Sequence, residues 1–261
     1  MYERPDVPKD SPHRNLIAVI VLVVVVVAVG VLVTTLWDLA NANSVLGSND
    51  LASAVESTIP AEESIWDQAE ATGLTVTGDE IETVLFAVAS DDPEGTLAAA
   101  YLAVLNNTQG TAKLLQFTSD EWIQVGEENL SVADWYAQKG VAGLASAISG
   151  SAVVPVSHIV AMTQDGWDSF MSIASKGSSA LQSQSRKLIK GITQTDMDAM
   201  ELVDIAQRAV ANGASSDSIA GVATNEVADE EGATRLQVDS AQLVLAVGTL
   251  CLLYTSPSPR D

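Results

Sequence analysis

The sequence predicts an α/β domain with a mixed central sheet flanked by helices, preceded by one N-terminal transmembrane helix. Three observations lead to this fold class. Several apolar runs have the length of a strand and lack polar alternation, which is typical of strands covered on both faces. Segments of helical period lie between these runs, as in layered α/β domains. Near the N-terminus, one uncharged run of 21 residues is long enough to cross a bilayer.

The N-terminal part predicts a cytoplasmic tail and a membrane anchor. Residues 1–15 hold three prolines and mixed charge, and Leu16–Leu36 follows with no charged side chain. At ~1.5 Å per residue this run spans the ~30 Å hydrocarbon core. The alternative is a signal peptide cleaved around Ala40–Ala42, whose apolar core would be only ~7–15 residues long. Because basic residues precede the run, the positive-inside rule predicts a single-pass protein of the cell membrane with a cytoplasmic N-terminus.

Two further segments flank the predicted extracytoplasmic domain, residues 79–250. Residues 37–78 are polar and acidic, with Pro60 as a break, and predict a stalk. Residues 251–261, CLLYTSPSPRD, resemble the translation of a sequencing-library adapter and are left out of the fold prediction. The only cysteine, Cys251, lies there, so neither a disulfide nor a thiolate metal site is expected.

The strands of the predicted domain follow from its apolar runs. Each run is about as long as a strand, and none alternates cleanly between polar and apolar residues. The predicted strands are Val84–Ser90, Ala98–Asn106, Ala112–Trp122 and Ser157–Thr163, with a small edge strand at Leu74–Thr77 and a last strand beginning at Arg235.

Capping residues mark the predicted helices. The segments Ser131–Ile148 and Thr163–Gly177 each begin with a hydroxyl residue and continue with helical periodicity. A third helix is predicted over Asp196–Asn212, with Thr195 as its cap and acidic residues in its first turn. A last, apolar helix ends near Leu250.

This arrangement resembles the LytR-CpsA-Psr family of bacterial cell-envelope proteins, some of which are labelled transcriptional attenuators. Family members begin with an apolar strand that ends in an acidic turn, as Val84–Asp92 does. Their third strand ends in a Pro-Arg-Asp corner, and Leu114–Val125 takes that place here. A strand and a helix that ends in glycines follow, and Val154–Gly177 matches their hydrophobic pattern. The resemblance covers roughly Glu82 to Val210.

The resemblance implies an activity as well as a fold. Family members transfer a glycopolymer from a polyprenyl pyrophosphate carrier to peptidoglycan, with a divalent cation such as Mg²⁺. Arginines hold the pyrophosphate because guanidinium groups match phosphate oxygens in a bidentate manner, and acids hold the metal. A hydrophobic tunnel between sheet and helices takes the lipid tail, and Val141–Ile148 is a candidate for its lining.

The acids of the family motif are retained at three positions. At the corner after the third strand, the family arginine corresponds to Ser119 and the family acid to Asp120. The later family pattern Asp-x-Asp-x-x-Arg-x-x-Arg places its two acids on Asp196 and Asp198. The resemblance therefore makes Asp120, Asp196 and Asp198 candidate metal ligands, for Mg²⁺ if the protein is active. The alternative is structural: a solvated strand-end acid at position 120, and acids that favour the helix dipole at the other two.

Both arginines of the helix motif are replaced by acids, Glu201 and Asp204. A carboxylate repels a phosphate where a guanidinium attracts it, so this inversion predicts a catalytically impaired family member. The basic residues Arg186, Lys187 and Lys190 are candidate replacements that bind substrate from a neighbouring loop. The alternative for them is a solvated basic face.

The charge and motif content exclude other functions. The net charge is −22, with 34 acidic against 12 basic residues, and such a surface repels nucleic acid. A DNA-binding role is therefore not expected. His158 stands alone in an apolar strand and is interpreted as a packed histidine. The sequence contains no Ser/His/Asp spacing, Gly-rich phosphate loop or paired-histidine metal motif.

Three functional hypotheses follow. The first is a membrane-anchored, catalytically impaired member of the LytR-CpsA-Psr family that contacts a polyprenyl-linked glycan or envelope proteins. The second is an active glycopolymer–peptidoglycan ligase whose basic residues have moved elsewhere. The third is a non-enzymatic extracellular scaffold or binding module that shares only the order of strands and helices.

Overall fold

The computed structural model describes residues 45–58, 69, 73–91, 95–228 and 232–248, and the backbone of 250–252. The predicted tail and transmembrane run lie outside these ranges. Within them, no helix combines the length and the apolar character needed to cross a bilayer. The described part therefore corresponds to the predicted α/β domain together with a segment that precedes it.

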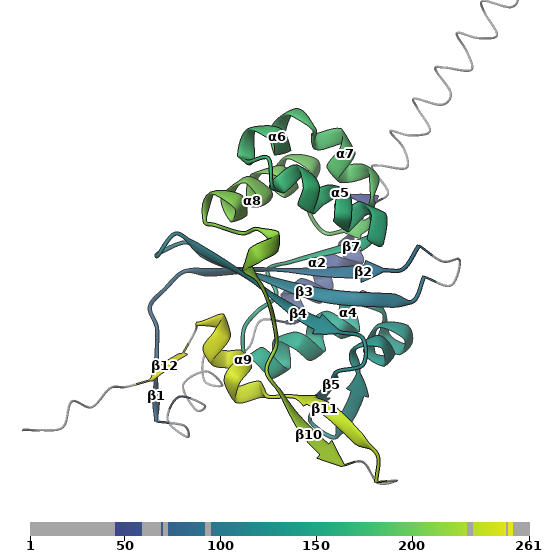
Figure 1. Cartoon of the computed structure of the whole chain (residues 1–261), viewed down its shortest axis with the longest axis vertical. Coiled ribbons are helices and arrows are strands. Elements are labelled where there is room, and N and C mark those ends of the chain that lie inside the picture. The colour runs from purple at the N-terminus through teal and green to yellow at the C-terminus, as the bar shows by residue number, and fades with distance from the viewer. Residues whose placement is uncertain are drawn as a thin grey trace, which may run out of the picture. The chain divides into compact units, whose positions relative to one another are not determined.

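A mixed six-stranded sheet forms the centre of the domain (Figure 1). Its strands are β2 Ile81–Ala89, β3 Leu97–Asn106, β4 Thr111–Thr118, β7 His158–Thr163, β8 Ile192–Thr195 and β9 Ile219–Gly221. Their order is β8-β7-β2-β3-β4-β9. Neighbouring strands β2, β3 and β4 are antiparallel, β7 runs parallel to β2, and β8 runs antiparallel to β7. The buried runs of β2 and β3 confirm the prediction of strands covered on both faces.

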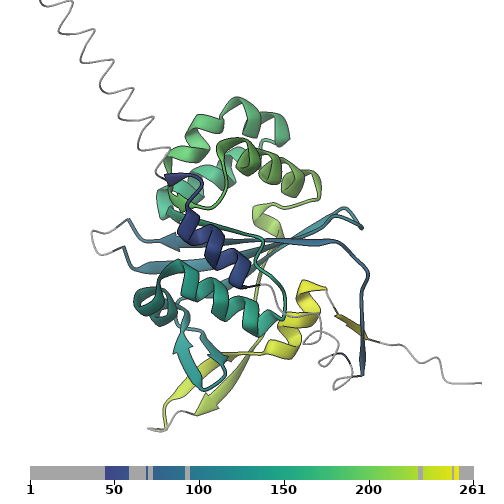
Figure 2. The ribbon, with the colours of Figure 1, turned by 180° about the vertical axis from the view of Figure 1, so that it is seen from behind.

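Helices cover both faces of this sheet, as the sequence predicted. The helices are α2 Asn49–Ser57, α4 Val132–Ala152, α5 Gln164–Ala174, α6 Ser178–Ser183, α7 Ser185–Lys190, α8 Ala199–Ala211 and α9 Ser240–Val247. Figure 1 shows α5 to α8 on one face of the sheet, and Figure 2 shows α2 and α4 side by side on the other. Each face of the sheet has its own hydrophobic core, and strand β2 contributes side chains to both. Leu85 belongs to the core on the α4 side, while Val84 and Phe86 belong to the core on the α5–α8 side.

A second, smaller sheet has the order β10-β11-β5-β6. Its strands are β5 Trp122–Val125, β6 Glu128–Ser131, β10 Thr224–Ala228 and β11 Thr234–Val238. The predicted third strand therefore ends at Thr118, and its continuation belongs to a different sheet. The break is a turn in which the buried Glu121 carboxylate accepts a hydrogen bond from the Thr118 amide at 2.9 Å. The predicted edge strand is β1 Leu74–Val76, which pairs only with β12 Leu250–Leu252 among the described strands.

Capping explains where helix α4 begins and ends. The Ser131 hydroxyl accepts a hydrogen bond from the Asp134 amide at 3.0 Å, which satisfies a free donor of the first turn. Val153 ends the helix in the left-handed region, with a φ of 49°. The helix is interrupted at Gly140, whose φ of 69° suits a residue without a Cβ. The predicted helix is confirmed and extends four residues past Ile148, to Ala152.

The segment that precedes the sheet is integrated into the domain. Helix α2 lies within residues 37–78, the range predicted as a stalk, yet Leu51 is buried in the core on the α4 side. Thr58 fixes the end of this segment, because its hydroxyl bonds with the backbone of Val156 and its carbonyl accepts from Ser149 Oγ at 2.7 Å. At least residues 49–58 thus pack against the fold rather than stand apart from it.

The start of helix α8 differs from the prediction. Its cap is Asp198, whose Oδ1 accepts hydrogen bonds from the amides of Met200 and Glu201 at 2.7 and 2.9 Å. Thr195, the predicted cap, is the last residue of β8 and donates its hydroxyl to the Ile159 carbonyl at 2.7 Å. The prediction was wrong here because β8 is a short polar strand whose bonds come from β7.

Two glycines pack backbone to backbone where α5 meets the turn before β8. A Cβ on Gly191 would overlap the Gly166 Cα, and one on Gly166 would lie 2.7 Å from the Gly191 Cα. Backbone atoms cannot move aside cheaply, so Gly191→Ala is expected to lower the free energy of unfolding by roughly 1–3 kcal/mol in urea titrations. Gly78→Ala is the control, because a Cβ there meets nothing within 4 Å. Equal losses in both variants would contradict this packing argument.

Candidate functional site

The layer between the sheet and helices α5 and α8 contains three regions in succession. Alternate residues of β2 point into it, so Glu82, Val84 and Phe86 mark a line across this layer. Glu82 belongs to a polar network, Val84 lines an apolar pocket, and Phe86 belongs to both the pocket and an aromatic cluster. These three regions are the candidate site.

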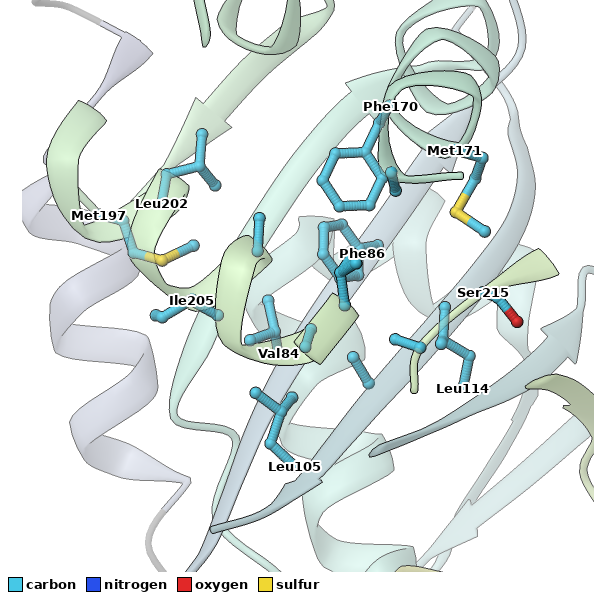
Figure 3. A pocket seen from close by; sticks show the side chains of 16 residues that line it. Val84, Phe86, Leu105, Leu114, Phe170, Met171, Met197, Leu202, Ile205 and Ser215 are labelled. Carbon is cyan, nitrogen blue, oxygen red and sulfur yellow. The ribbon is translucent and has the colours of Figure 1, made fainter. Parts of the chain in front are cut away.

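The apolar pocket lies between the sheet and helices α5 and α8 (Figure 3). It is lined by Val84, Phe86, Ala103, Leu105, Leu114, Phe170, Met171, Ala174, Met197, Leu202, Ile205, Ala206, Ala209, Val210, Ala214 and Ser215. The cavity itself measures about 30 Å³, and the looser space of about 530 Å³ around it includes gaps between atoms and open solvent, so a ligand enters only when the lining side chains move apart. Ser215 contributes the one polar side chain of this lining, and Figure 3 shows it near Leu114 and Met171. Met197, one of the lining residues, is fully buried.

An aromatic cluster borders the pocket toward the carboxyl end of β2. Trp167 stacks on Tyr101 with ring centroids 4.2 Å apart and an interplanar angle of 12°. Phe86 packs against Trp167 and Phe170 at 5.4 and 5.6 Å. Gln116 Nε2 donates to the Tyr101 hydroxyl at 3.4 Å, so the polar end of this buried ring has a partner.

A network of charged side chains borders the pocket at the other end. His158 Nδ1 lies 2.8 Å from Asp196 Oδ2, and the other carboxylate oxygen of Asp196 accepts from the Ile159 amide at 2.7 Å. His158 Nε2 faces two further carboxylates, at 4.0 Å from Glu82 Oε1 and 3.9 Å from Glu201 Oε1. His158 is packed, with its side chain 18% exposed, but it does not stand alone, because three acids from different segments surround it.

The three carboxylates decide the protonation of His158. Burial lowers the pKa of the imidazole, but the hydrogen bond to Asp196 and the charges of Asp196, Glu201 and Glu82 outweigh it, so the pKa is raised above its ordinary value. The charged imidazolium is therefore the form that this environment favours.

Arg208 also belongs to this network, because it pairs with both Glu82 and Asp204. Its guanidinium forms a two-pronged pair with Glu82, in which Nη1 contacts Oε2 and Nη2 lies 3.1 Å from Oε1. Its Nε donates to Asp204 Oδ2 at 3.1 Å, one turn earlier on α8. Burial raises the pKa of Glu82, but the hydrogen bond and charge of Arg208 lower it more, so the net pKa lies below its ordinary value. The network ties α8 to β2 and β7.

The structure does not bring the two parts of the predicted catalytic site together. Ser119 and Asp120 follow Thr118, which pairs with Ala99 at the carboxyl end of β2. Asp196 and Glu201 lie with Glu82 at the amino end of β2, because β8 runs antiparallel to β7. About four residues, or ~13 Å, separate them along the strands, and β7, β2 and β3 lie between β8 and β4 across the sheet.

The predicted metal ligands have other partners. Asp120 accepts from Thr118 Oγ1 at 2.7 Å, Asp196 is bound to His158, and Asp198 caps α8. Within the described residues, no group of three or more His, Cys, Asp or Glu side chains is arranged to hold a metal ion. The residues present do not fit the Mg²⁺ site that the resemblance implies.

The other predicted functional residues also lie outside the pocket. Arg186, Lys187 and Lys190 are exposed on α7 and do not contribute to the pocket lining. Asp204 is exposed and paired with Arg208. The predicted tunnel lining, Val141–Ile148, belongs to α4 on the opposite face of the sheet, where most of its residues form the other core. The pocket residues were not predicted as such, since an apolar stripe on α5 or α8 looks the same whether it fills a core or lines a cavity.

Comparisons with known proteins show the fold but no close relative. No family model and no curated protein matches the sequence. The crystal structure of Bacillus subtilis TagV is similar with a TM-score of 0.50 at 10% identity, covering 66% of this chain and 96% of that chain. The structure of the Bacillus subtilis transcriptional regulator YvhJ has a TM-score of 0.49 at 12% identity, over 66% of this chain and 96% of that one.

A third structure is described as the LytR-CPS2A-Psr family protein YwtF (TagT) with bound octaprenyl pyrophosphate lipid. Its TM-score is 0.47 at 12% identity, over 64% of this chain and 87% of that one. The likeness to TagV is one of fold alone, because so low an identity carries neither site residues nor activity. The described α/β domain has the LytR-CpsA-Psr-like fold that the sequence pattern predicted.

Proposed function

We propose that this protein binds an isoprenoid lipid chain in the apolar pocket and lacks the phosphotransfer chemistry of the LytR-CpsA-Psr family. The observation that carries the proposal is the pocket itself, whose lining is apolar except for Ser215. An apolar cleft of this kind gains free energy by burying a hydrocarbon chain. Met171 and Met197 are flexible side chains that adjust to the shape of such a ligand.

The charges near the pocket argue against binding and transfer of a pyrophosphate. Glu82, Glu201 and Asp196 crowd one end of the layer, and Arg208, the guanidinium in this network, is held by Glu82 and Asp204. A pyrophosphate placed there meets carboxylates rather than free cations. At the corner after β4, Ser119 stands where the family has its arginine.

The proposed setting is the outer side of a cell membrane, with residues 16–36 as the anchor. This placement rests on the uncharged run and on the basic residues before it. A polyprenyl-linked glycan is the ligand class that the sequence resemblance suggests, and its lipid part is the part that the pocket suits.

Calorimetry on the full chain in detergent tests this proposal. We expect octaprenol and octaprenyl pyrophosphate to bind with dissociation constants that agree within about threefold, with or without Mg²⁺, because the pocket recognises the chain rather than the head group. Pyrophosphate-selective binding that strengthens tenfold or more with Mg²⁺ would instead support the active ligase. No binding of either lipid by the folded protein would leave the scaffold hypothesis.

A pair of alanines on α8 locates the binding site. Ala209 lines the pocket and is partly buried, so Ala209→Phe should fill the pocket and weaken octaprenol binding by tenfold or more. Ala211 lies on the same helix but is exposed and outside the lining, so Ala211→Phe should bind like the unaltered protein. Equal affinities of the two variants would place the lipid elsewhere.

A further inference from the structure

Among the stretches of this chain that lack acidic residues, one is rich in basic residues. The 27 residues from 169 to 195 contain no Asp or Glu, although the whole sequence has 34 of them. The same stretch contains four basic residues, Lys176, Arg186, Lys187 and Lys190. It forms the end of α5, helices α6 and α7, and β8. This composition sets one surface apart from the rest of a protein with a net charge of −22.

The four basic side chains lie on the outside of the domain. All of them are exposed, and within the described ranges none forms an ion pair with an acid. On α7, Leu188 is the buried anchor, while Arg186, Lys187 and Lys190 take the solvent side. We call the surface formed by α6 and α7 with these residues the cationic face. Figure 1 shows it at the end of the domain opposite the β10–β11 hairpin.

A groove lined by both apolar and polar side chains adjoins the cationic face between α7 and α8. Its lining comprises Gln182, Ser185, Ile189, Ala199, Met200, Val203, Asp204 and Gln207. Met200 is 83% exposed, far more than the other exposed large apolar residues, Val227 at 45% and Leu236 at 39%. Ser185 and Ile189 occupy one stripe of α7, and Arg186 and Lys190 occupy the next. The basic stripe of α7 thus adjoins the stripe of the same helix that lines the groove.

We propose that the cationic face is a docking surface for an anionic phospholipid bilayer. Arg186, Lys187 and Lys190 contact lipid phosphates, while Met200 inserts at the boundary between head groups and acyl chains. Asp198, Glu201 and Asp204 lie beside Met200 and oppose this contact, whereas acids farther away than the Debye length of ~8–10 Å are screened. The inference does not depend on whether the apolar pocket holds a lipid.

The arrangement favours a bilayer over a small anion. Successive basic residues of α7 fan out over its outer surface, so they suit a plane of phosphates rather than one phosphate group. The groove lining combines apolar side chains with neutral polar ones and the Asp204 carboxylate, which repels a single bound anion. A soluble polyanion is the remaining competitor, and the test separates it from a bilayer.

Site-specific fluorescence on the full chain tests this docking. With Cys251 replaced by serine, Met200→Cys is labelled with the environment-sensitive dye NBD. Val227→Cys, on the β10–β11 hairpin, carries the same dye as the matched control. Vesicles of phosphatidylcholine alone, or with 30% phosphatidylglycerol, are added with brominated acyl chains as contact quenchers. We expect the fluorescence emission of NBD at position 200 to shift to the blue in the anionic vesicles. Its quenching there should be at least twofold greater than in the neutral vesicles, and NBD at position 227 should show neither change.

Reversing the charge of two basic residues on α7 gives a second test of the docking. Arg186→Glu with Lys187→Glu should abolish the difference between anionic and neutral vesicles at position 200, because lipid attraction scales with the number of nearby basic residues. Both side chains are exposed, so the fold should remain intact by circular dichroism. Equal quenching at positions 200 and 227, or none at 200 in anionic vesicles, would overturn the proposal. Displacement of the signal by soluble polyphosphate at unchanged ionic strength would assign the cationic face to a polyanion instead.

Discussion

Replacing Arg208 with methionine is expected to lower the free energy of unfolding by about 2–3 kcal/mol. Arg208 neutralises Glu82, whose side chain is only 17% exposed and lies near Glu201. Removing the guanidinium leaves this carboxylate in a poorly hydrated place beside other acids, which costs more than the pair itself contributes. Arg208 is 39% exposed, so water offsets part of the loss, and the expected value lies below that of a fully buried pair.

Urea unfolding followed by tryptophan fluorescence measures this loss. Lys139→Met is the matched control, because Lys139 pairs with Glu128 at 2.8 Å on the surface, with side chains 42% and 55% exposed. That variant should change stability by less than about 0.5 kcal/mol. The Glu82→Gln/Arg208→Met double variant should recover part of the loss, since the poorly hydrated Glu82 carboxylate is gone and only the exposed Asp204 loses its partner. If Arg208→Met costs no more than Lys139→Met, the network does not stabilise the contact between α8 and the sheet.

The same pair predicts a response to acid. Because the folded pKa of Glu82 lies below its unfolded value, its contribution is present above the unfolded pKa and is lost as the pH falls through the folded pKa. The unaltered protein should therefore lose stability below about pH 4.3 more steeply than the Glu82→Gln variant. Parallel curves for the two proteins below that pH would contradict the assignment.

The sequence predicted those strands and helices that are determined by residues close together in the chain. The apolar runs at β2 and β3 needed no partner to be recognised, because burial on both faces leaves an uninterrupted hydrophobic pattern. Ser131 and Thr163 predicted the starts of α4 and α5 because a capping hydroxyl satisfies amides two or three residues away. The layered α/β class followed from the alternation of these strands and helices.

Short strands could not be predicted in the same way. Strand β8 reads ITQT, which has no apolar pattern of its own, and β7 supplies its hydrogen bonds. Missing β8 moved the predicted start of α8 back to Asp196, although Asp198 is the residue that caps it. The break after Thr118 was missed because Trp122–Val125 continues the apolar run while pairing with another sheet.

The candidate site depended on long-range geometry. Glu82 and Arg208 are 126 positions apart, and no spacing rule in one sequence relates them. Aligning this chain with a family motif suggested that Asp120 and Asp196 share a site. The antiparallel course of β8 instead takes Asp196 to His158, at the opposite edge of the sheet from Asp120. The family motif identified Asp120 and Asp196 as candidate site residues. The order and direction of the strands determine that Asp196 contacts His158 and not Asp120.

Replacing His158 with glutamine is expected to remove a pH-dependent part of the stability. His158 has a raised pKa because its bond to Asp196 and the charges of Asp196, Glu201 and Glu82 outweigh the effect of burial. A raised folded pKa means that the stabilisation is complete below the unfolded value of about 6.5 and disappears as the pH rises through the folded value. At about pH 6, we expect His158→Gln to be less stable by roughly 2 kcal/mol, the size of a charged hydrogen bond.

The difference between the two proteins should narrow as the pH rises through the folded pKa of His158, because the imidazole of the unaltered protein then becomes neutral as well. Urea titrations from about pH 6 to pH 9 measure this convergence across the histidine range. His13→Gln removes the other histidine of the chain and serves as the control for an effect of histidine content alone. A constant difference across the range would mean that His158 contributes by packing, and that its three acidic neighbours do not hold a charge on it.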